Sequence, residues 1–452
     1  MKSVRELIHA RSERYMGWYL EACSIPSLAE NADGLDEMAE WVESKLVSIG
    51  ASVERLTHDG APDVLLGQIG SGDRSVLIYN HYDVQPVDPL DLWNSKPFEP
   101  RVSDGVIYAR GASDNKGDLV ARLAGLQIYQ EVFGELPLRI KFLVEGEEEN
   151  GSRSLAEIVS RHRSKLEADG CIWEGAGTDH VGRPKLTFGV KGLAYVELVC
   201  RGLSHDQHSQ HAVIVPSPVW HLVEALNTLR TRDGRVQIDG FYDDVVAPTD
   251  ADLESLEAYP YDEEAERGRL GVDRFINDDS GISLLRRLFY EPTCNIAGII
   301  SGFTVPGASK TVLPKEVMAK LDMRLVPNQN PVDIVDKLRR HLDKRGFDDI
   351  EINRHQMQHP VRSPNDSPIA RAAVAASEDV FGKSSAAGPT NIGTGPMHAI
   401  ADTLGVPMVS PAGVCRPESN IHAPNERARV EDFLRIIEYT DAWIIAFANI
   451  DL

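Results

Sequence analysis

Two patterns of apolar residues alternate along the first 190 positions, one typical of buried strands and one typical of helices. Short apolar runs at 76–79, 138–144 and 171–173 predict strands that are covered on both faces. Between them, residues 116–133 and 154–166 have helical spacing. Strands that alternate with helices predict an α/β fold, in which a mostly parallel sheet is covered by helices.

The pattern changes near Lys191. Residues 194–201 and 317–325 alternate apolar and polar side chains, as expected of strands with one face in water. The first pattern resumes after Pro364 and continues to a closing helix at 430–449. We therefore predict two domains. Residues 1–190 and 362–452 form the first domain, and an α+β domain of residues 191–361 is inserted into it.

Three predicted strands of the first domain end in side chains that can bind metal ions. The strand at 76–79 runs into His81 and Asp83, a strand expected at 106–109 runs into Asp114, and the strand at 138–144 runs into Glu148 and Glu149. Because open α/β sheets place ligands at the carboxyl ends of their strands, these three ends predict one common site. Ligands of the His, Asp and Glu types, without Cys, suit Zn²⁺ or a similar divalent ion.

Each of these side chains has an expected role. Asp114 precedes a helix and could bridge two ions in a hydrolytic clamp, while Asp83 could orient the imidazole of His81. Glu148 and Glu149 point in different directions on an extended backbone, so one could bind metal while its neighbour acts as general base. Taken singly, each residue also has an ordinary structural role, and only the set favours a site. Further candidate ligands are Glu174 and His422.

Composition excludes several classes of function. The net charge of −22 argues against a nucleic-acid partner, because phosphate backbones require basic patches. No stretch approaches the roughly 18 apolar residues of a membrane span, and residues 1–10 lack the apolar core of a secretion signal. The five cysteines are dispersed, without C-x-x-C spacing, which argues against a disulfide framework and a thiolate zinc site. We therefore expect a cytoplasmic protein without a membrane partner.

Seven short motifs follow one another in a fixed order along the chain. They are HYDVQP (81–86), GASDNKG (111–117), EGEEENGS (145–152), DQHS (206–209), KTVLP (310–314), RLVP (324–327) and HAPNE (422–426). In sequence and order these motifs resemble those of the M20 metallopeptidases, a family of aminoacylases, carboxypeptidases and dipeptidases. The resemblance runs nearly from end to end.

This resemblance implies a catalytic metal-binding domain at 1–190 and 362–452, and a lid and dimerisation domain at 191–361. It also implies two zinc ions in each subunit, although Mn²⁺ and Co²⁺ fit the same ligands. One ion would be held by His81, Asp114 and Glu174, and the other by Asp114, Glu149 and His422.

The family pattern also distinguishes the two adjacent glutamates. Alignment on the glycine and serine that follow them makes Glu148 the general base and Glu149 the metal ligand. Asp169 and Asp179 remain alternatives to Glu174 as a ligand. Within the family, a glutamate at this place resembles the N-acyl-amino-acid and carboxypeptidase members, whereas an aspartate resembles many dipeptidases.

The resemblance places the substrate contacts in and near the inserted domain. Arg324 would pair with the free carboxylate of the substrate through its two-pronged guanidinium. His208, rather than His205 or His211, matches the family motif and would stabilise the oxyanion, reaching across from the partner subunit. The complete set of expected substrate contacts is His208, Arg324, Asn295 and Gly395.

We therefore predict a homodimeric, zinc-dependent hydrolase of the dipeptidase or carboxypeptidase type. It would cleave a peptide or amide bond next to a free carboxylate by means of metal-activated water, and its substrate would be a small peptide. The alternative enzyme is an N-acyl-amino-acid deacylase. A metal-binding relative without catalytic activity would require a missing base or ligand, yet every expected position is occupied.

Overall fold

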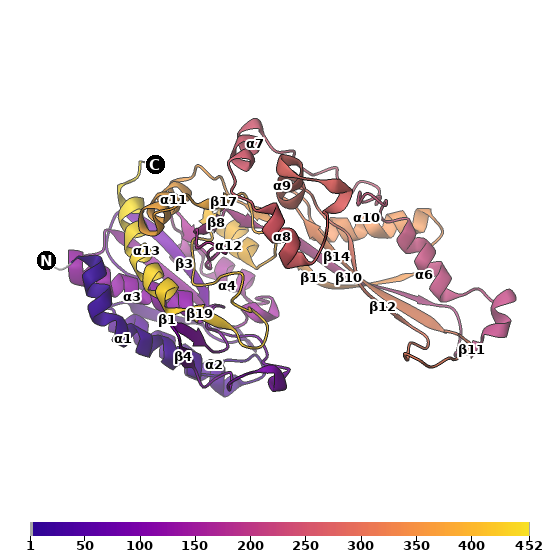
Figure 1. Cartoon of the computed structure of the whole chain (residues 1–452), viewed down its shortest axis with the longest axis horizontal. Helices are drawn as coiled ribbons and strands as arrows, with labels where there is room; N and C mark the ends of the chain where they lie inside the picture. The colour runs from indigo at the N-terminus through magenta and orange to yellow at the C-terminus, as the bar shows by residue number, and fades with distance from the viewer. Residues whose placement is uncertain (1–2, 452) are drawn as a thin grey trace. The chain divides into compact units, whose positions relative to one another are not determined.

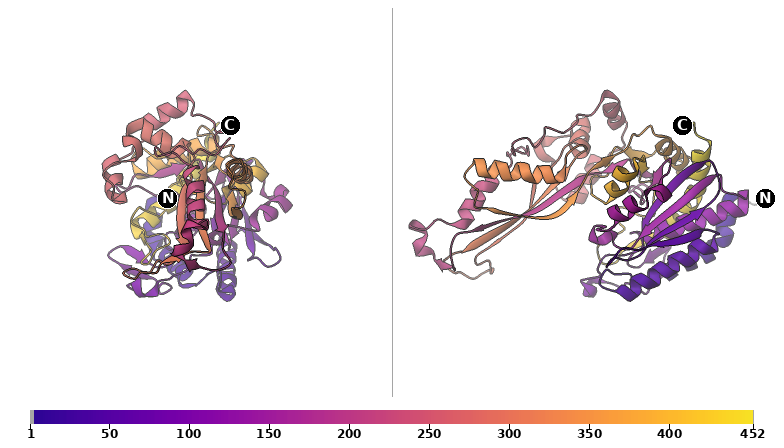
Figure 2. Two further views of the ribbon diagram at one scale, coloured as in Figure 1. Left: turned by 90° about the vertical axis from the view of Figure 1, so that its right-hand side faces the viewer. Right: turned by 180° about the vertical axis from the view of Figure 1, so that it is seen from behind.

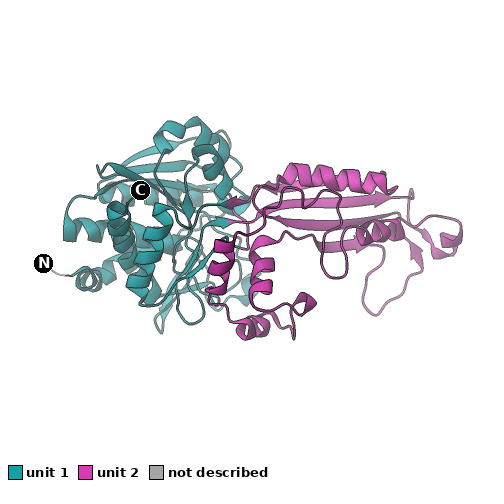
Figure 3. Ribbon diagram, turned by 90° about the horizontal axis from the view of Figure 1, so that it is seen from above, with its two compact units in different colours: residues 1–189, 362–391, 396–452 teal, residues 190–361, 392–395 magenta. Residues whose placement is uncertain are grey.

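The computed structural model describes residues 3–451, which form two compact units (Figure 3). Unit 1 consists of Met1–Gly189, Arg362–Asn391 and Pro396–Leu452. Unit 2 consists of Val190–Val361 together with the short segment Ile392–Gly395. The chain therefore passes from unit 1 to unit 2 and returns, and four residues of its last part belong to unit 2.

Unit 1 is built on a six-stranded sheet with the strand order β1-β2-β6-β3-β7-β18. Its strands are β1 (Ser52–Leu56), β2 (Val64–Ile69), β3 (Arg74–His81), β6 (Leu138–Glu145), β7 (Cys171–Ile172) and β18 (Met408–Val409). The pairs from β6 to β18 are parallel, whereas β1 and β2 form an antiparallel edge. The predicted α/β class with a mostly parallel sheet is confirmed.

Helices cover this sheet (Figures 1 and 2). They are α1 (Val4–Ser24), α2 (Ala32–Ser48), α3 (Lys116–Phe133), α4 (Leu155–Arg161), α5 (Arg163–Leu166), α11 (Pro368–Phe381), α12 (Met397–Leu404) and α13 (Val430–Asn449). Helix α3 contacts β3 as well as α1 and α13, which explains why it is apolar on nearly all sides. The main hydrophobic core lies in these layers.

A second, smaller sheet of unit 1 corrects one prediction. The strand expected at 106–109 is not part of the main sheet. It forms β5 (Val106–Tyr108), which pairs in antiparallel fashion with β4 (Arg101–Ser103) and β19 (Arg427–Arg429). The turn between β4 and β5 consists of Asp104 and Gly105, both with positive φ, as a two-residue hairpin requires. Asp114 therefore does not follow a strand of the main sheet.

Unit 2 contains a four-stranded antiparallel sheet with the order β12-β14-β10-β15. Its strands are β10 (Gly192–Arg201), β12 (Asn295–Ser301), β14 (Glu316–Leu325) and β15 (Glu351–Gln358). Side chains of β14 alternate between buried and more exposed positions, as the sequence pattern predicts for a strand with one wet face. Helices α6 (Pro218–Asn227) and α10 (Pro331–Lys344) pack on the sheet and enclose a separate core.

The acidic stretch at 248–266 is helical, which its sequence did not indicate. It contains α7 (Asp250–Glu257) and the start of α8 (Glu263–Leu270), followed by α9 (Gly281–Tyr290). A small cluster of Leu256, Leu285, Phe289 and Tyr290 joins α7 to α9. The remaining short strands are β8 (Lys185–Thr187), β9 (Gly189–Val190), β11 (Gln207–His208), β13 (Val312–Leu313), β16 (Val361–Arg362) and β17 (Ala386–Gly388). Within residues 3–451, no helix is both long and apolar enough to cross a membrane.

Candidate metal centre

Side chains from separate segments of unit 1 meet at the carboxylate of Asp114. His81 is the last residue of β3 and is fully buried, and its Nε2 lies 3.1 Å from Asp114 Oδ1. Nε2 of His422 lies 3.0 Å from Asp114 Oδ2 and 3.3 Å from Oε2 of Glu149. The two oxygens of Asp114 thus face two different imidazoles. A carboxylate placed in this way can bridge two cations.

Asp83 connects two of the segments that carry these residues. Its backbone carbonyl lies 3.1 Å from Nδ1 of His81 and its Oδ1 lies 3.4 Å from the same nitrogen, on the opposite side of the ring from Asp114. Its two carboxylate oxygens accept hydrogen bonds from the backbone N–H groups of Glu148 (3.2 Å) and Glu149 (2.9 Å). Asp83 is fully buried. It therefore orients the imidazole and the glutamate turn together.

Glu149 is the middle residue of a short 3-10 turn, Glu148–Asn150, which begins shortly after β6 ends at Glu145. Its side chain is only 5% exposed. Oε2 accepts a hydrogen bond of 2.8 Å from Gln85 Nε2, whereas Oε1 is buried and has no hydrogen-bond partner among the described residues. The ligand atoms of His81, Asp114 and Glu149 all lie within 4.8 Å of one another. A buried carboxylate oxygen without a donor is costly, which favours a cation at this position.

Glu174 follows β7 and is the carboxylate that the fold brings to this cluster. Its Oε1 is also buried without a hydrogen-bond partner, and its charge acts on His81 and Glu148. The two alternatives lie elsewhere. Asp169 accepts hydrogen bonds from the backbone and hydroxyl of Ser75, near the start of β3 rather than its end. Asp179 accepts hydrogen bonds from backbone N–H groups of its own turn.

The cluster carries more negative than positive charge. Burial, together with the charge of Glu174, raises the pKa of Glu148 well above its usual value, and burial raises the pKa of Glu174 to about 8. Hydrogen bonds to Asp114 and Glu149 raise the pKa of His422 to about 10. Burial lowers the pKa of His81, but its hydrogen bonds to Asp114 and Asp83 outweigh this effect and raise it overall. The site therefore binds protons tightly and is suited to cations that would replace them.

Two buried charged residues that support the cluster were missed by the sequence reasoning. Glu426 accepts hydrogen bonds from Arg110 (2.7 Å) and from the backbone N–H groups of Gly111, Ser113 and Asp114. It thereby fixes the loop that presents Asp114. The sequence indicated part of this contact, because Glu426 lies in one of the seven motifs and Arg110 directly precedes another. Their pairing appears only in the folded chain.

Arg122 of α3 is the second such residue. Its Nη1 donates to the carbonyl of Tyr79 (3.0 Å) and to Oδ1 of Asn80 (2.9 Å), and its Nη2 donates to the carbonyl of Trp173 (2.5 Å). These contacts join the ends of β3 and β7, just before His81 and Glu174. A helix that reads as uniformly buried gives no indication that one of its arginines aligns two strand ends.

The remaining expected site residues lie in unit 2. Arg324, the penultimate residue of β14, donates a hydrogen bond to the hydroxyl of Thr394, which is next to Gly395. Asn295 donates to Asp322 on the same strand as Arg324, at 2.8 Å. His208 is exposed, and its Nε2 lies 3.1 Å from the hydroxyl of Thr311. Arg324 and Gly395 are thus neighbours, and Asn295 lies beside the same strand.

Comparisons with known proteins point in one direction. Residues 77–446 match the model of the peptidase family M20/M25/M40. The chain is 37% identical to an M20 family metallo-carboxypeptidase from Sulfolobus solfataricus, covering 96% of this chain and 99% of that one with a TM-score of 0.90. It is 31% identical over 362 residues to the Cys-Gly metallodipeptidase dug1 of Schizosaccharomyces pombe, covering 75% of each chain. Human carnosine dipeptidase 1 is 26% identical, with a TM-score of 0.82 and coverage of 99% and 98%.

Proposed function

The chain belongs to the peptidase family M20/M25/M40 and is a metallopeptidase that hydrolyses peptide bonds, and from this premise we propose that the cluster around Asp114 is its catalytic metal centre. The observation that carries this proposal is the carboxylate of Asp114, whose two oxygens face two imidazoles at 3.1 and 3.0 Å. Two divalent ions would be held by His81, Asp114, Glu149, Glu174 and His422, with Asp114 shared between them.

The side chains present fit such ions. Two oxygens, Oε1 of Glu149 and Oε1 of Glu174, are buried without a hydrogen-bond donor, and a cation would satisfy both. The ligands are imidazoles and carboxylates, which Zn²⁺ accepts and which Mn²⁺ and Co²⁺ also accept. We propose Zn²⁺ as the resident ion. The chemistry supplied by a bound pair of such ions is polarisation of the scissile carbonyl and a lowered pKa of water.

Glu148 is placed to act as the general base. It is next to the ligand Glu149, and Asp83 holds the backbone N–H groups of both residues. Burial raises the pKa of Glu148 well above that of an exposed glutamate, which makes its carboxylate a stronger base. Glu148 would take the proton from the attacking water and then deliver it to the nitrogen of the leaving amine.

The substrate's own charge would be recognised by residues of unit 2. Arg324 is only partly exposed, and one arm of its guanidinium is held by Thr394. A guanidinium held in this way retains donors for a carboxylate. We assign Arg324 to the free carboxylate of the substrate, His208 to the oxyanion of the tetrahedral intermediate, and Asn295 and Gly395 to further substrate contacts.

The substrate class that this assignment supports is a dipeptide or short peptide with a free C-terminus. Proteins to which the chain is similar include Cys-Gly and β-Ala-His dipeptidases and a metallo-carboxypeptidase. In all three substrate types, a carboxylate lies close to the bond that is cleaved. An N-acyl amino acid also has this carboxylate, so the deacylase alternative differs only in the group on the other side of the bond.

A hydrolysis screen tests this function. Zinc-loaded protein would be assayed on dipeptides (Cys-Gly and β-Ala-His among them), tripeptides, their C-terminal amides and N-acetyl and N-succinyl amino acids, each with and without a chelator. We expect chelator-sensitive cleavage of peptides with a free C-terminus. In Arg324→Ala, kcat/KM should fall by about 100-fold on these peptides, because a hydrogen bond between two charged groups is lost. It should change little on the amides.

Two other outcomes of the screen would contradict parts of the proposal. Cleavage of the N-acyl amino acids alone would assign the protein to the deacylases. Equal losses of kcat/KM on free and amidated peptides would remove Arg324 from carboxylate recognition. Lys191→Ala is a matched control, because Lys191 is a cation of the same unit whose ammonium group donates instead to the carbonyl of Glu291.

We further propose that two copies of the chain associate through unit 2. Strand β12 lies at the edge of its sheet, so one side of its backbone has no partner strand among residues 3–451. Its side chains Ile296, Ile299 and Ile300 are 46%, 53% and 64% exposed, and Trp220 at the start of α6 is 68% exposed. An exposed apolar edge strand has unpaired backbone groups that can pair with a strand of another chain. A homodimer would cover it.

We also propose a cytoplasmic location. All five cysteines are free thiols, and four of them are buried. Proteins of oxidising compartments commonly use their cysteines in disulfides, whereas free buried thiols are usual in a reducing compartment.

A further inference from the structure

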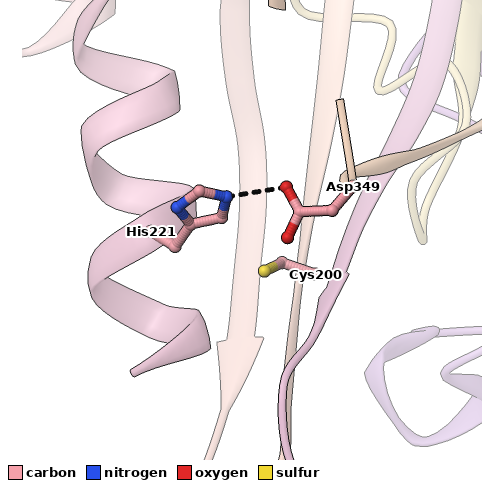
Figure 4. A group of neighbouring side chains, drawn as sticks. All are labelled: Cys200, His221 and Asp349. Carbon is pink, nitrogen blue, oxygen red and sulfur yellow. Dashed lines mark hydrogen bonds and ion pairs between the residues drawn. The ribbon is translucent and has the colours of Figure 1, made fainter. Parts of the chain in front are cut away.

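Unit 2 contains a second group of side chains with the character of metal ligands. Cys200 lies near the end of β10, His221 lies on α6, and Asp349 lies in the turn before β15 (Figure 4). Their ligand atoms, one from each residue, all lie within 4.8 Å of one another. None of the three belongs to the cluster around Asp114, which is in unit 1. The three residues come from separate elements, so no spacing in the sequence indicates their proximity.

We propose that Cys200, His221 and Asp349 form a separate binding site for a divalent cation of the zinc class. Thiolate, imidazole and carboxylate together are a ligand set typical of Zn²⁺, and three protein ligands leave one tetrahedral position for water. Ligand bonds of about 2.0–2.3 Å place two ligands of one ion roughly 3–4 Å apart. The three ligand atoms lie within 4.8 Å of one another, so small side-chain movements would bring them to the spacing that one ion requires.

The fold holds the three ligands in different ways. Cys200 is 2% exposed and is fixed by its place in the sheet, where it pairs with Val317. His221 lies on a helix that packs against this sheet, with its ring 5.1 Å from that of Phe347. Asp349 is more exposed, and its Oδ1 lies 2.8 Å from Nε2 of His221. The site thus has a rigid buried side and an open side through which an ion can enter.

A metal site explains this arrangement better than a nucleophilic one. In a Cys-His-Asp nucleophile site, the imidazole stands between the thiol and the carboxylate. Figure 4 shows the sulfur of Cys200 and the carboxylate of Asp349 on the same side of the imidazole ring. In addition, burial and the charge of Asp349 raise the pKa of Cys200 to about 11, the reverse of what an activated thiol requires.

Binding would exchange one proton for one ion. At neutral pH Cys200 is a thiol, and it must lose its proton as the sulfur–metal bond forms, so a proton is released to solvent. The bound ion would join β10, α6 and the turn before β15. Because the ion would bind only the folded arrangement, it would stabilise unit 2 in proportion to its concentration above the dissociation constant.

Cobalt titration tests this site without relying on catalysis. Co²⁺ would be added to the chelator-treated full-length protein while its absorption is recorded. A thiolate ligand gives an intense near-ultraviolet charge-transfer band, and the cluster around Asp114 cannot produce one because it contains no cysteine. We expect this band in the wild-type protein. In Cys200→Ser, both the band and one equivalent of bound cobalt should be lost. In Cys294→Ser, which alters another buried cysteine of unit 2, the band should be retained.

Two results would overturn the proposal. One is the absence of the charge-transfer band from wild-type protein that binds cobalt elsewhere, and the other is persistence of the band in Cys200→Ser. If Cys200→Ser does not fold, Asp349→Asn provides the test, since Asp349 is the most exposed of the three ligands. This substitution should weaken the cobalt affinity measured from the charge-transfer band by about tenfold or more. An unchanged affinity would exclude Asp349 as a ligand and overturn the proposed site.

Discussion

Asp83 shows how much of the candidate centre depends on a residue that need not bind metal. Its carboxylate lies 3.4 Å from the imidazole of His81 and accepts the backbone N–H groups of Glu148 and Glu149. The imidazole, the proposed base and a proposed ligand are therefore positioned by one buried side chain. Such outer contacts fix the orientation of ligands and commonly change metal affinity by about 10–100-fold.

Asp83→Asn tests this positioning. The amide has one acceptor oxygen and one N–H₂ group, so one of the two backbone N–H groups loses its acceptor, at a cost of about 1–3 kcal/mol. We expect metal affinity to fall by about 10–100-fold and kcat/KM to fall with it, as measured by metal titration and dipeptide hydrolysis. Asp59→Asn, at an exposed position, serves as the control. Wild-type metal affinity in Asp83→Asn would contradict the role.

At the scale of elements, α13 contains a buried carboxylate that no hydrogen bond satisfies. Asp441 is 2% exposed, and both of its carboxylate oxygens are buried without a hydrogen-bond partner in the part of the chain that the structure describes. Burial, together with the nearby charge of Glu438, raises the pKa of Asp441 to about 9. The ordinary pKa of an aspartate is about 3.9. Between these values the folded chain binds more protons than the unfolded chain, so stability falls as pH rises.

Asp441→Asn should therefore stabilise the protein, and more so at higher pH. The amide cannot ionise, so the variant avoids a cost that grows through the window from about 4 to 9 and is complete above it. We expect the melting temperature of the variant to exceed that of the wild type by several degrees at pH 8, because a gain of 1 kcal/mol raises it by about 1 °C in a chain of 452 residues, and ionisation of Asp441 costs several times that amount there.

At pH 5 the two melting temperatures in that comparison should converge. Asp379→Asn, at an exposed position on α11, should show no such pH dependence. A constant difference between the wild type and Asp441→Asn at both pH values would show that Asp441 is not ionising with the shifted pKa.

The elements that the sequence predicted well are those with a strong apolar period. Helices such as α13 and strands such as β14 bury side chains in the pattern that their sequences show. Helix α8 was missed because it has no buried residue among those described, so periodicity cannot reveal it. The sequence predicted β5 in the wrong sheet. One of its partners, β4, is close in sequence, but the other, β19, lies more than 300 residues away along the chain.

In the candidate centre, too, some features could be predicted from the sequence and others appear only in the folded chain. The motifs identify the residue types, and the fold brings His81, Asp114, Glu149 and His422 together in unit 1. Contacts that align those residues were not visible in the sequence. A buried ion pair such as Arg110–Glu426 depends on segments that meet only after folding, and an isolated arginine or glutamate in a sequence is most often exposed.

At the scale of the whole molecule, the exposed edge of β12 predicts a dimer. Ile300→Glu places a charge on this edge, where it would be desolvated in a dimer interface, and we expect the variant to be monomeric by light scattering. Ile445→Glu, at a partly exposed position of unit 1, should leave the dimer intact. A wild-type protein that is monomeric throughout the micromolar range, or an Ile300→Glu variant that remains dimeric, would contradict this interface.

We propose that a metal centre at Asp114, with Glu148 as its base, hydrolyses peptide bonds. Measuring kcat and bound metal together in Glu148→Gln, on a dipeptide that the wild type cleaves, tests this proposal. We expect kcat to fall by about 10²–10⁴-fold, the usual contribution of a general base, while two metal ions per chain are retained. Hydrolysis within a few-fold of wild type at full metal content would contradict it.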